Sequence, residues 1–258
     1  MRTRDSASPD EPSDDALRAR FDDAARPAAT RGEIDWYVAR LPRDAGLCLD
    51  AMCGSGRLLV PLLARGIAIQ GADGSGAALA LAEARLDAEG LATTLYRQSL
   101  SALNLPTRYA AAILDGSAFA RIADPVAARL ALERLHMHLV GPGLLIVDAR
   151  VPPYAGSRYG APLVEMKSVA LDDGSKIRMR SETSVDADAR LARTDARYTH
   201  RHGARALAEA HARGAVTWYA GSELAELLVE AGWRDVAEVA SPGAIDDGET
   251  GYALTART

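Results

Sequence analysis

The residues that could bind a nucleotide are concentrated in two short stretches in the first third of the chain. The first, Leu49-Asp-Ala-Met-Cys-Gly-Ser-Gly-Arg57, places Gly54 and Gly56 between a short apolar strand and a helix. Glycines in such a turn let the backbone pass close to a ligand because they carry no Cβ, and the helix that follows offers unpaired N–H groups. The second stretch ends in Asp73, whose carboxylate can accept two hydrogen bonds from a ribose diol. Together they predict the front half of a nucleotide-binding α/β domain.

The elements that must position these residues alternate along the chain. Strands are predicted at 46–50, 67–72, 92–97, 109–114 and 143–149, and helices at 56–65, 75–89 and 124–139. Gly66 and Gly90 stand where helices typically end, and Asp124-Pro125 is a typical helix start. Strands at 233–240 and 249–257 would complete the sheet as a pair, with the last strand antiparallel. This order predicts an α/β fold with a Rossmann-like, seven-stranded, mostly parallel sheet and helices on both faces.

Other segments fall outside this alternation. Residues 1–13 are rich in Asp, Ser, Pro and Arg and predict a disordered tail, with helices at about 14–25 and 30–40 after it. Residues 163–200 alternate apolar and polar side chains around the hairpin signal Asp172-Asp173-Gly174, which predicts a small antiparallel β insert. The segment 204–213 fits either a helix or a strand, and a last helix would begin after Ser222 as its N-cap.

The glycine-rich stretch resembles motif I of the class I S-adenosylmethionine-dependent methyltransferases, whose usual form is acid-x-Gly-x-Gly-x-Gly. Asp50 is the acid here, and Met52 stands where the family has its first glycine. Further segments similar to the family follow in the family's order, at 71–75, 96–106, 109–119, 139–148 and 223–233. The resemblance covers roughly residues 21–257. It implies a single methyltransferase domain over residues 14–258, with residues 14–45 as a helical lid and the insert at 163–200 near the acceptor site.

The resemblance also implies the site residues. The implied cofactor-binding residues are Asp50, Met52, Gly54, Gly56, Asp73, Gly74, Gln98, Ser99, Leu100, Asp115 and Ser117. Asp73 would hold the ribose, and residues 98–100 would lie at the adenine. Asp115, after the fourth strand, is the candidate catalytic base, with Tyr198 and His200 as further candidates. Arg31 and Tyr37 could cover the carboxylate end of the cofactor as part of the lid.

The chemistry implied is methyl transfer from S-adenosylmethionine to an oxygen or nitrogen of a small molecule, with S-adenosylhomocysteine as product. The sulfonium is already activated. The protein therefore has to align acceptor, methyl carbon and sulfur for an in-line displacement, and orientation supplies much of the rate. A general base is needed only where the acceptor must lose a proton.

Composition narrows the partners and the setting. The chain has 258 residues, 48% of them apolar, and a net charge of −5 with 30 basic and 35 acidic residues, so no basic excess suggests nucleic acid. The longest apolar runs are far shorter than the roughly 18 residues of a membrane span. The two cysteines form no disulfide framework, which fits a reducing cytoplasm. The five histidines show no metal-binding spacing, so no metal is expected. Oligomeric state is not readable from the sequence.

Two alternatives remain open at this point. A nicotinamide-dependent oxidoreductase would need Gly-x-Gly-x-x-Gly, and Leu59 occupies the position of its third glycine. A degenerate relative that binds the cofactor or another nucleotide without catalysis is the other alternative. Met52 in place of glycine and Ser99 in place of the usual acid at the adenine favour it.

Overall fold

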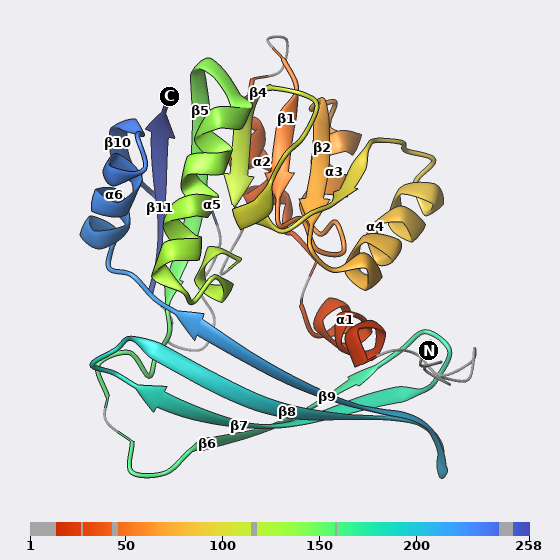
Figure 1. The fold of residues 1–258 in the computed structure, drawn as a ribbon. Coiled ribbons are helices and arrows are strands. Elements are labelled where there is room, and N and C mark those ends of the chain that lie inside the picture. The colour runs from red at the N-terminus through yellow and green to blue at the C-terminus, as the bar shows by residue number, and fades with distance from the viewer. Residues whose placement is uncertain (1–13, 27, 43–45, 115–117, 158, 243–249) are drawn as a thin grey trace, which may run out of the picture.

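A computed structural model describes residues 14–26, 28–42, 46–114, 118–157, 159–242 and 250–258 (Figure 1). Its larger sheet has seven strands in the order β10-β11-β5-β4-β1-β2-β3. These are β1 (Cys48–Ala51), β2 (Ile69–Asp73), β3 (Leu95–Arg97), β4 (Tyr109–Leu114), β5 (Leu139–Val151), β10 (Arg234–Val239) and β11 (Thr250–Arg257). Strands β1 to β5 run parallel to one another, and β11 is antiparallel to both β5 and β10. The prediction of a seven-stranded, mostly parallel sheet is confirmed.

Helices cover both faces of this sheet, also as predicted (Figure 1). They are α2 (Arg31–Val38), α3 (Leu59–Ala64), α4 (Gly76–Ala88), α5 (Pro125–His138) and α6 (Gly221–Glu230). One core cluster joins the sheet to α5 and α6 through side chains such as Leu132 and Leu228, and a second joins it to α2 and α3 through Ile34 and Leu62. No helix in the described part of the chain is long and apolar enough to cross a membrane.

Side-chain caps mark the starts of α4 and α5, whereas α3 begins after Leu58 without one. Asp124 caps α5, with Pro125 at its first position, and Ser75 caps α4 by accepting from the Ala78 N–H. Ser222 does not cap α6, which begins two residues earlier, at Gly221 after Ala220. The carboxylate of Glu223 accepts from the Ala220 N–H at 2.8 Å, and this bond takes the place of the predicted serine cap.

A second, four-stranded antiparallel sheet packs below the first (Figure 1). Its strands are β6 (Leu163–Ala170), β7 (Lys176–Asp186), β8 (Leu191–His202) and β9 (Arg205–Thr217). The β6–β7 hairpin turns at the predicted Asp172-Asp173-Gly174. The sheet continues past residue 200 because the alanine-rich segment forms β9, with Ala210 opposite Tyr198 and Ala212 opposite Ala196. Cross-strand pairing here outweighs the helix propensity of alanine.

Helix α1 (Asp14–Ala25) lies between the two sheets (Figure 1). Leu17 and Phe21 are buried against the four-stranded sheet, and the Phe21 ring meets the Tyr198 ring edge-on with centroids 5.3 Å apart. The other side of α1 contacts α4 through polar bonds. Ser75 Oγ donates to Asp15 Oδ2 at 2.9 Å, and Arg85 Nη2 donates to Asp23 Oδ1 at 2.6 Å. The helix therefore connects the two parts of the molecule.

Candidate cofactor and acceptor site

The glycine-rich loop after β1 has an unusual backbone. Met52, Gly54 and Gly56 all have positive φ, at 62°, 54° and 80°. A Cβ at Gly56 would stand 3.1 Å from Val60 Cγ2, so this glycine is required for α3 to pack closely. A Cβ at Gly54 would meet no described atom within 4 Å, so this backbone faces open space. The loop therefore combines one glycine that serves packing with one that leaves room for a ligand.

Asp73, at the end of β2, holds this loop in place. Its Oδ2 accepts from the Gly54 N–H at 2.9 Å, and its Oδ1 accepts from the Ser75 N–H at 2.8 Å. A carboxylate has about four acceptor positions, so each oxygen keeps one for a further donor. The sequence predicts only a ligand contact for Asp73. The structure adds that the same carboxylate joins the glycine loop to the start of α4.

Asp50 and Cys53 lie in the buried part of the loop. Asp50 is 1% exposed at the end of β1. Burial raises the pKa of the Cys53 thiol well above its usual value, and the negative charges of Asp50 and Asp73 raise it further. Cys53 is therefore a neutral thiol beside two carboxylates. Met52 is partly buried and packs against the core cluster on the α5 side of the sheet.

The end of β3, where the adenine contact was predicted, is partly engaged in structural bonds. The Gln98 side chain bonds the backbone of Asn104 in both directions, accepting from its N–H at 2.7 Å and donating to its carbonyl at 3.2 Å. Ser99 is exposed and precedes a short turn of 3-10 helix, while Leu100 is buried in the core. Gly74 lies next to Ser99, since a Cβ built on it would stand 3.8 Å from Ser99 Cα, an ordinary contact distance. Asp115 and Ser117 lie outside the described residues.

Charged residues with no sequence motif face this edge from α1 and from the turn η2 (Phe119–Arg121). Arg18 Nε lies 3.6 Å and Arg121 Nη2 lies 3.8 Å from Asp22 Oδ2. Sequence reasoning missed all three residues, and the i, i+4 spacing of Arg18 and Asp22 was the one available signal. The ring of Phe119, in the same turn, lies 5.8 Å from the ring of Tyr219.

Tyr198 and His200, the further base candidates, are both buried in β8. Burial, followed by the charge of Asp22, raises the pKa of Tyr198, so its phenol stays protonated and can act as a donor. His200 Nε2 lies 2.7 Å from Ser175 Oγ, which in turn donates to Asp173. Because the serine proton goes to the carboxylate, the imidazole Nε2–H donates to the serine oxygen. These hydrogen bonds, from His200 to Ser175 and from Ser175 to Asp173, hold the β6–β7 turn.

Helix α2 contacts the glycine loop through a residue other than Arg31 and Tyr37, the two that were predicted to lie there. Arg31 is almost fully exposed and lies near Asp35, and Tyr37 is buried in the core. Neither is placed for the predicted carboxylate contact. Instead, Glu33 forms two hydrogen bonds with Arg57, directly after Gly56, at 2.6 and 3.0 Å.

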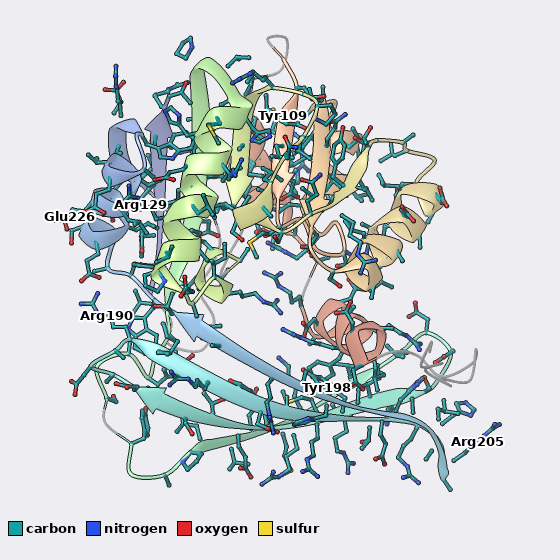
Figure 2. All side chains as sticks on the ribbon, in the orientation of Figure 1. Tyr109, Arg129, Arg190, Tyr198, Arg205 and Glu226 are labelled. Atoms are coloured by element: carbon teal, nitrogen blue, oxygen red, sulfur yellow. The ribbon has the colours of Figure 1, made fainter. Side chains whose placement is uncertain are left out.

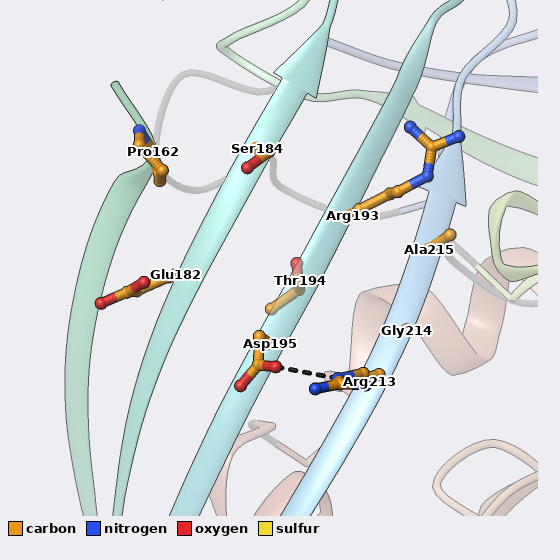
Figure 3. A pocket seen from close by; sticks show the side chains of 9 residues that line it. All are labelled: Pro162, Glu182, Ser184, Arg193, Thr194, Asp195, Arg213, Gly214 and Ala215. Atoms are coloured by element: carbon orange, nitrogen blue, oxygen red, sulfur yellow. Dashed lines mark hydrogen bonds and ion pairs between the residues drawn. The ribbon is translucent and has the colours of Figure 1, made fainter.

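One cavity lies away from the glycine loop, and a second borders it. A groove of about 470 Å³ on the face of the four-stranded sheet opposite α1 is lined by residues such as Glu182, Arg193 and Asp195 (Figure 3). Hydrogen bonds from His211 and Arg213 lower the pKa of Asp195 there. A cavity of about 870 Å³ extends from the back of the glycine loop to the β6–β7 turn. Among the described residues, no group of three His, Cys, Asp or Glu side chains could hold a metal ion.

Comparison with known proteins agrees with this geometry. Residues 48–143 match the family model described as a methyltransferase domain. No curated protein sequence matches the chain. The match covers β1 to β4 and the start of β5, and it includes the glycine loop and Asp73 at the end of β2.

Solved structures of similar fold span nearly the whole chain. An S-adenosylmethionine-dependent methyltransferase from Clostridium acetobutylicum ATCC 824 has 17% identity and a TM-score of 0.73, covering 93% of this chain and 97% of that one. A sugar N-methyltransferase from Streptoalloteichus sp. ATCC 53650 has 19% identity and a TM-score of 0.70, covering 100% and 98%. An amino pentose methyltransferase from Micromonospora echinaspora, bound to S-adenosylmethionine, has 23% identity and a TM-score of 0.62, covering 94% and 95%. Residues 48–143 thus match the methyltransferase-domain family model, and nearly the whole chain shares the fold of these S-adenosylmethionine-dependent methyltransferase structures.

Proposed function

We propose that this protein transfers a methyl group from S-adenosylmethionine to an oxygen or nitrogen of a small molecule and releases S-adenosylhomocysteine. The observation that carries the proposal is the Asp73 carboxylate. It is fixed by the N–H groups of Gly54 and Ser75 at 2.9 and 2.8 Å, beside a glycine loop with open space at Gly54. A fixed carboxylate next to an accessible backbone suits a ribose diol and the methionine portion of the cofactor attached to that ribose.

Each part of the cofactor has candidate partners in this arrangement. Asp73 and Gly74 would contact the ribose, and Asp50, Met52, Gly54 and Gly56 would line the methionine end. At the adenine we assign the backbone of Ser99 and Leu100, because the Gln98 amide is bonded to Asn104. Asp115 and Ser117 would lie near the reacting methyl group.

The acceptor pocket is proposed between the edge of the seven-stranded sheet, α1 and the four-stranded sheet. This assigns residues 14–45 as the lid and the second sheet as the wall that shapes the acceptor site. The fold shared with sugar and amino pentose methyltransferases supports a small polar acceptor. Within this pocket the protein's task is to align the acceptor with the sulfonium and to exclude water. Tyr198, as a neutral phenol, would donate a hydrogen bond rather than remove a proton, so Asp115 remains our candidate base.

Calorimetric titration with S-adenosylhomocysteine tests the cofactor assignment directly. We expect the wild-type protein to bind, and Asp73→Asn to weaken binding about ten- to a hundredfold, because a hydrogen bond to a charged group contributes about 1.5–3 kcal/mol. Asp172→Asn, the same change in the exposed β6–β7 turn, is the matched control and should bind like the wild type.

The same titration separates the alternatives. An absence of binding in the wild-type protein would refute the assignment, and tight binding of NADH instead would favour the oxidoreductase. Binding without turnover of S-adenosylmethionine across a panel of small amines and alcohols would favour the degenerate cofactor-binding protein.

A further inference from the structure

Two guanidinium groups, one from α1 and one from the turn after β4, share a single carboxylate oxygen. Arg18 Nε and Arg121 Nη2 lie 3.6 and 3.8 Å from Asp22 Oδ2, beyond the usual range of a hydrogen bond. Within the described ranges of the chain, neither guanidinium donates a hydrogen bond. Each carries five N–H donors, and the side chains are 31% and 47% exposed. Most of these donors are therefore available to a ligand.

Positive charge exceeds negative charge around the cluster formed by Arg18, Asp22 and Arg121. Arg121 is repelled by Arg18 and Arg26 and attracted by Asp22 and Asp73. Three positive charges therefore face two negative ones, which leaves an excess positive charge. Desolvation, followed by the repulsion of Arg18, lowers the pKa of Arg121, and the attraction of Asp22 and Asp73 opposes this. Because an arginine stays charged in proteins, the imbalance persists and a bound anion would relieve it.

The cluster lies beside the proposed cofactor site. Arg121 ends the turn that follows β4, and Asp73 is close enough to influence its charge. Tyr198, on β8 beneath α1 in Figure 2, responds to the charges of Asp22, Arg18 and Arg121. Arg18 and Arg121 thus approach the same space from α1 and from the end of the parallel sheet, where the acceptor would meet the methyl group.

We propose that Arg18 and Arg121 form an oxyanion subsite that binds a carboxylate or phosphate group of the methyl acceptor. This rests on the proposed function for the identity of the ligand. Guanidinium groups bind such oxyanions through paired, charge-assisted hydrogen bonds. Asp22 holds the two arginines toward each other while the subsite is empty and competes with the incoming anion. An acidic small molecule is therefore the acceptor class that this cleft selects.

Inorganic phosphate is the probe, titrated by calorimetry into the full-length protein with and without saturating S-adenosylhomocysteine. We expect Arg121→Gln to raise the phosphate Kd about tenfold, since a hydrogen bond to a charged group contributes about 1.5–3 kcal/mol. Asp22→Asn should lower the Kd several-fold, because it removes the competing charge. Arg129→Gln on the exposed face of α5 is the matched control and should leave the Kd unchanged.

The opposite effects of Arg121→Gln and Asp22→Asn distinguish a binding site from a loss of folding, which would weaken binding in both. Arg18→Gln is the second variant, and it too should weaken binding. Equal phosphate affinity in Arg121→Gln, Arg18→Gln and the wild type would overturn the proposal. So would a loss of S-adenosylhomocysteine affinity in Arg121→Gln with phosphate binding unchanged, because the cluster would then serve the cofactor's carboxylate.

Titrations without S-adenosylhomocysteine separate the two proposals. If the wild-type protein binds phosphate through the arginines but never binds S-adenosylhomocysteine, the methyltransferase assignment fails and the oxyanion subsite stands. If it binds S-adenosylhomocysteine but phosphate binding is unaffected by Arg121→Gln and Arg18→Gln, the subsite fails and the cofactor assignment stands.

Discussion

The Arg57 guanidinium and the Glu33 carboxylate form a bidentate ion pair that joins helix α2 to the glycine loop. The donors Nη2 and Nη1 lie 2.6 and 3.0 Å from Oε1 and Oε2, and the two side chains are only 13% and 8% exposed. Glu33 also completes a capping box with Thr30 at the start of α2. One carboxylate thus helps to cap the start of α2 and positions the residue after Gly56.

Removing this carboxylate's charge should be strongly destabilising. Breaking a buried pair by removing one partner costs about 3–5 kcal/mol, because the remaining charge is left uncompensated. We therefore expect Glu33→Gln to lower the free energy of unfolding by that amount in urea denaturation. Glu133→Gln, which breaks the exposed pair with Arg129 on α5, should cost less than about 1 kcal/mol. Equal losses in the two variants would contradict this reading of the pair.

Met52 occupies a backbone conformation that favours glycine, with φ at 62°. A left-handed backbone costs about 1–2 kcal/mol in a residue with a Cβ. Met52→Gly would remove that cost but lose the apolar contacts of Met52 and add chain entropy to the unfolded state. We expect its net effect on urea stability to be within about 1 kcal/mol. Met52→Val should be clearly less stable than Met52→Gly, since a β-branched residue fits this region poorly; the reverse order would show that packing dominates.

His200 should make stability depend on pH below neutrality. Burial, followed by the charge of Arg20, lowers the pKa of His200 below its usual 6.5. The unfolded chain then binds a proton more readily, so stability is lost as the pH falls below about 6.5. In urea denaturation from about pH 7 to about pH 5, His200→Gln should lose less stability than the wild type, because this proton uptake is removed. Parallel pH curves for the two proteins would contradict the prediction.

Both cysteines should be unreactive in the folded protein. Burial raises the pKa of Cys48 to about 12 and also raises that of Cys53. The thiolate is the reacting species. We therefore expect Ellman's reagent at about pH 8 to modify neither thiol in buffer and both in denaturant. Rapid modification of Cys53 in buffer would mean that the glycine loop opens readily.

The main sheet and the glycine loop could be predicted because their signals are local. Apolar strands, the glycines at 54, 56 and 66 and the Asp124-Pro125 start each act on a few neighbouring residues. Such signals also placed Asp73 at the end of β2, beside the loop. They predicted a ligand contact for Asp73, but they could not show that its carboxylate bonds the backbone of Gly54 and Ser75.

The remaining features depended on contacts between distant segments. The alanine-rich segment forms β9 because it pairs with β8. The helix propensity of its own residues does not reveal this partner. The Gln98 side chain bonds the backbone of Asn104, and Tyr37 is buried in the core. Both contacts depend on segments that come together only in the folded chain. Arg18, Asp22 and Arg121 share no motif and meet only when α1 packs between the two sheets. The sequence alone thus determined the α/β framework and its glycine loop through short-range backbone preferences, while tertiary packing decided which charged side chains come together beside them.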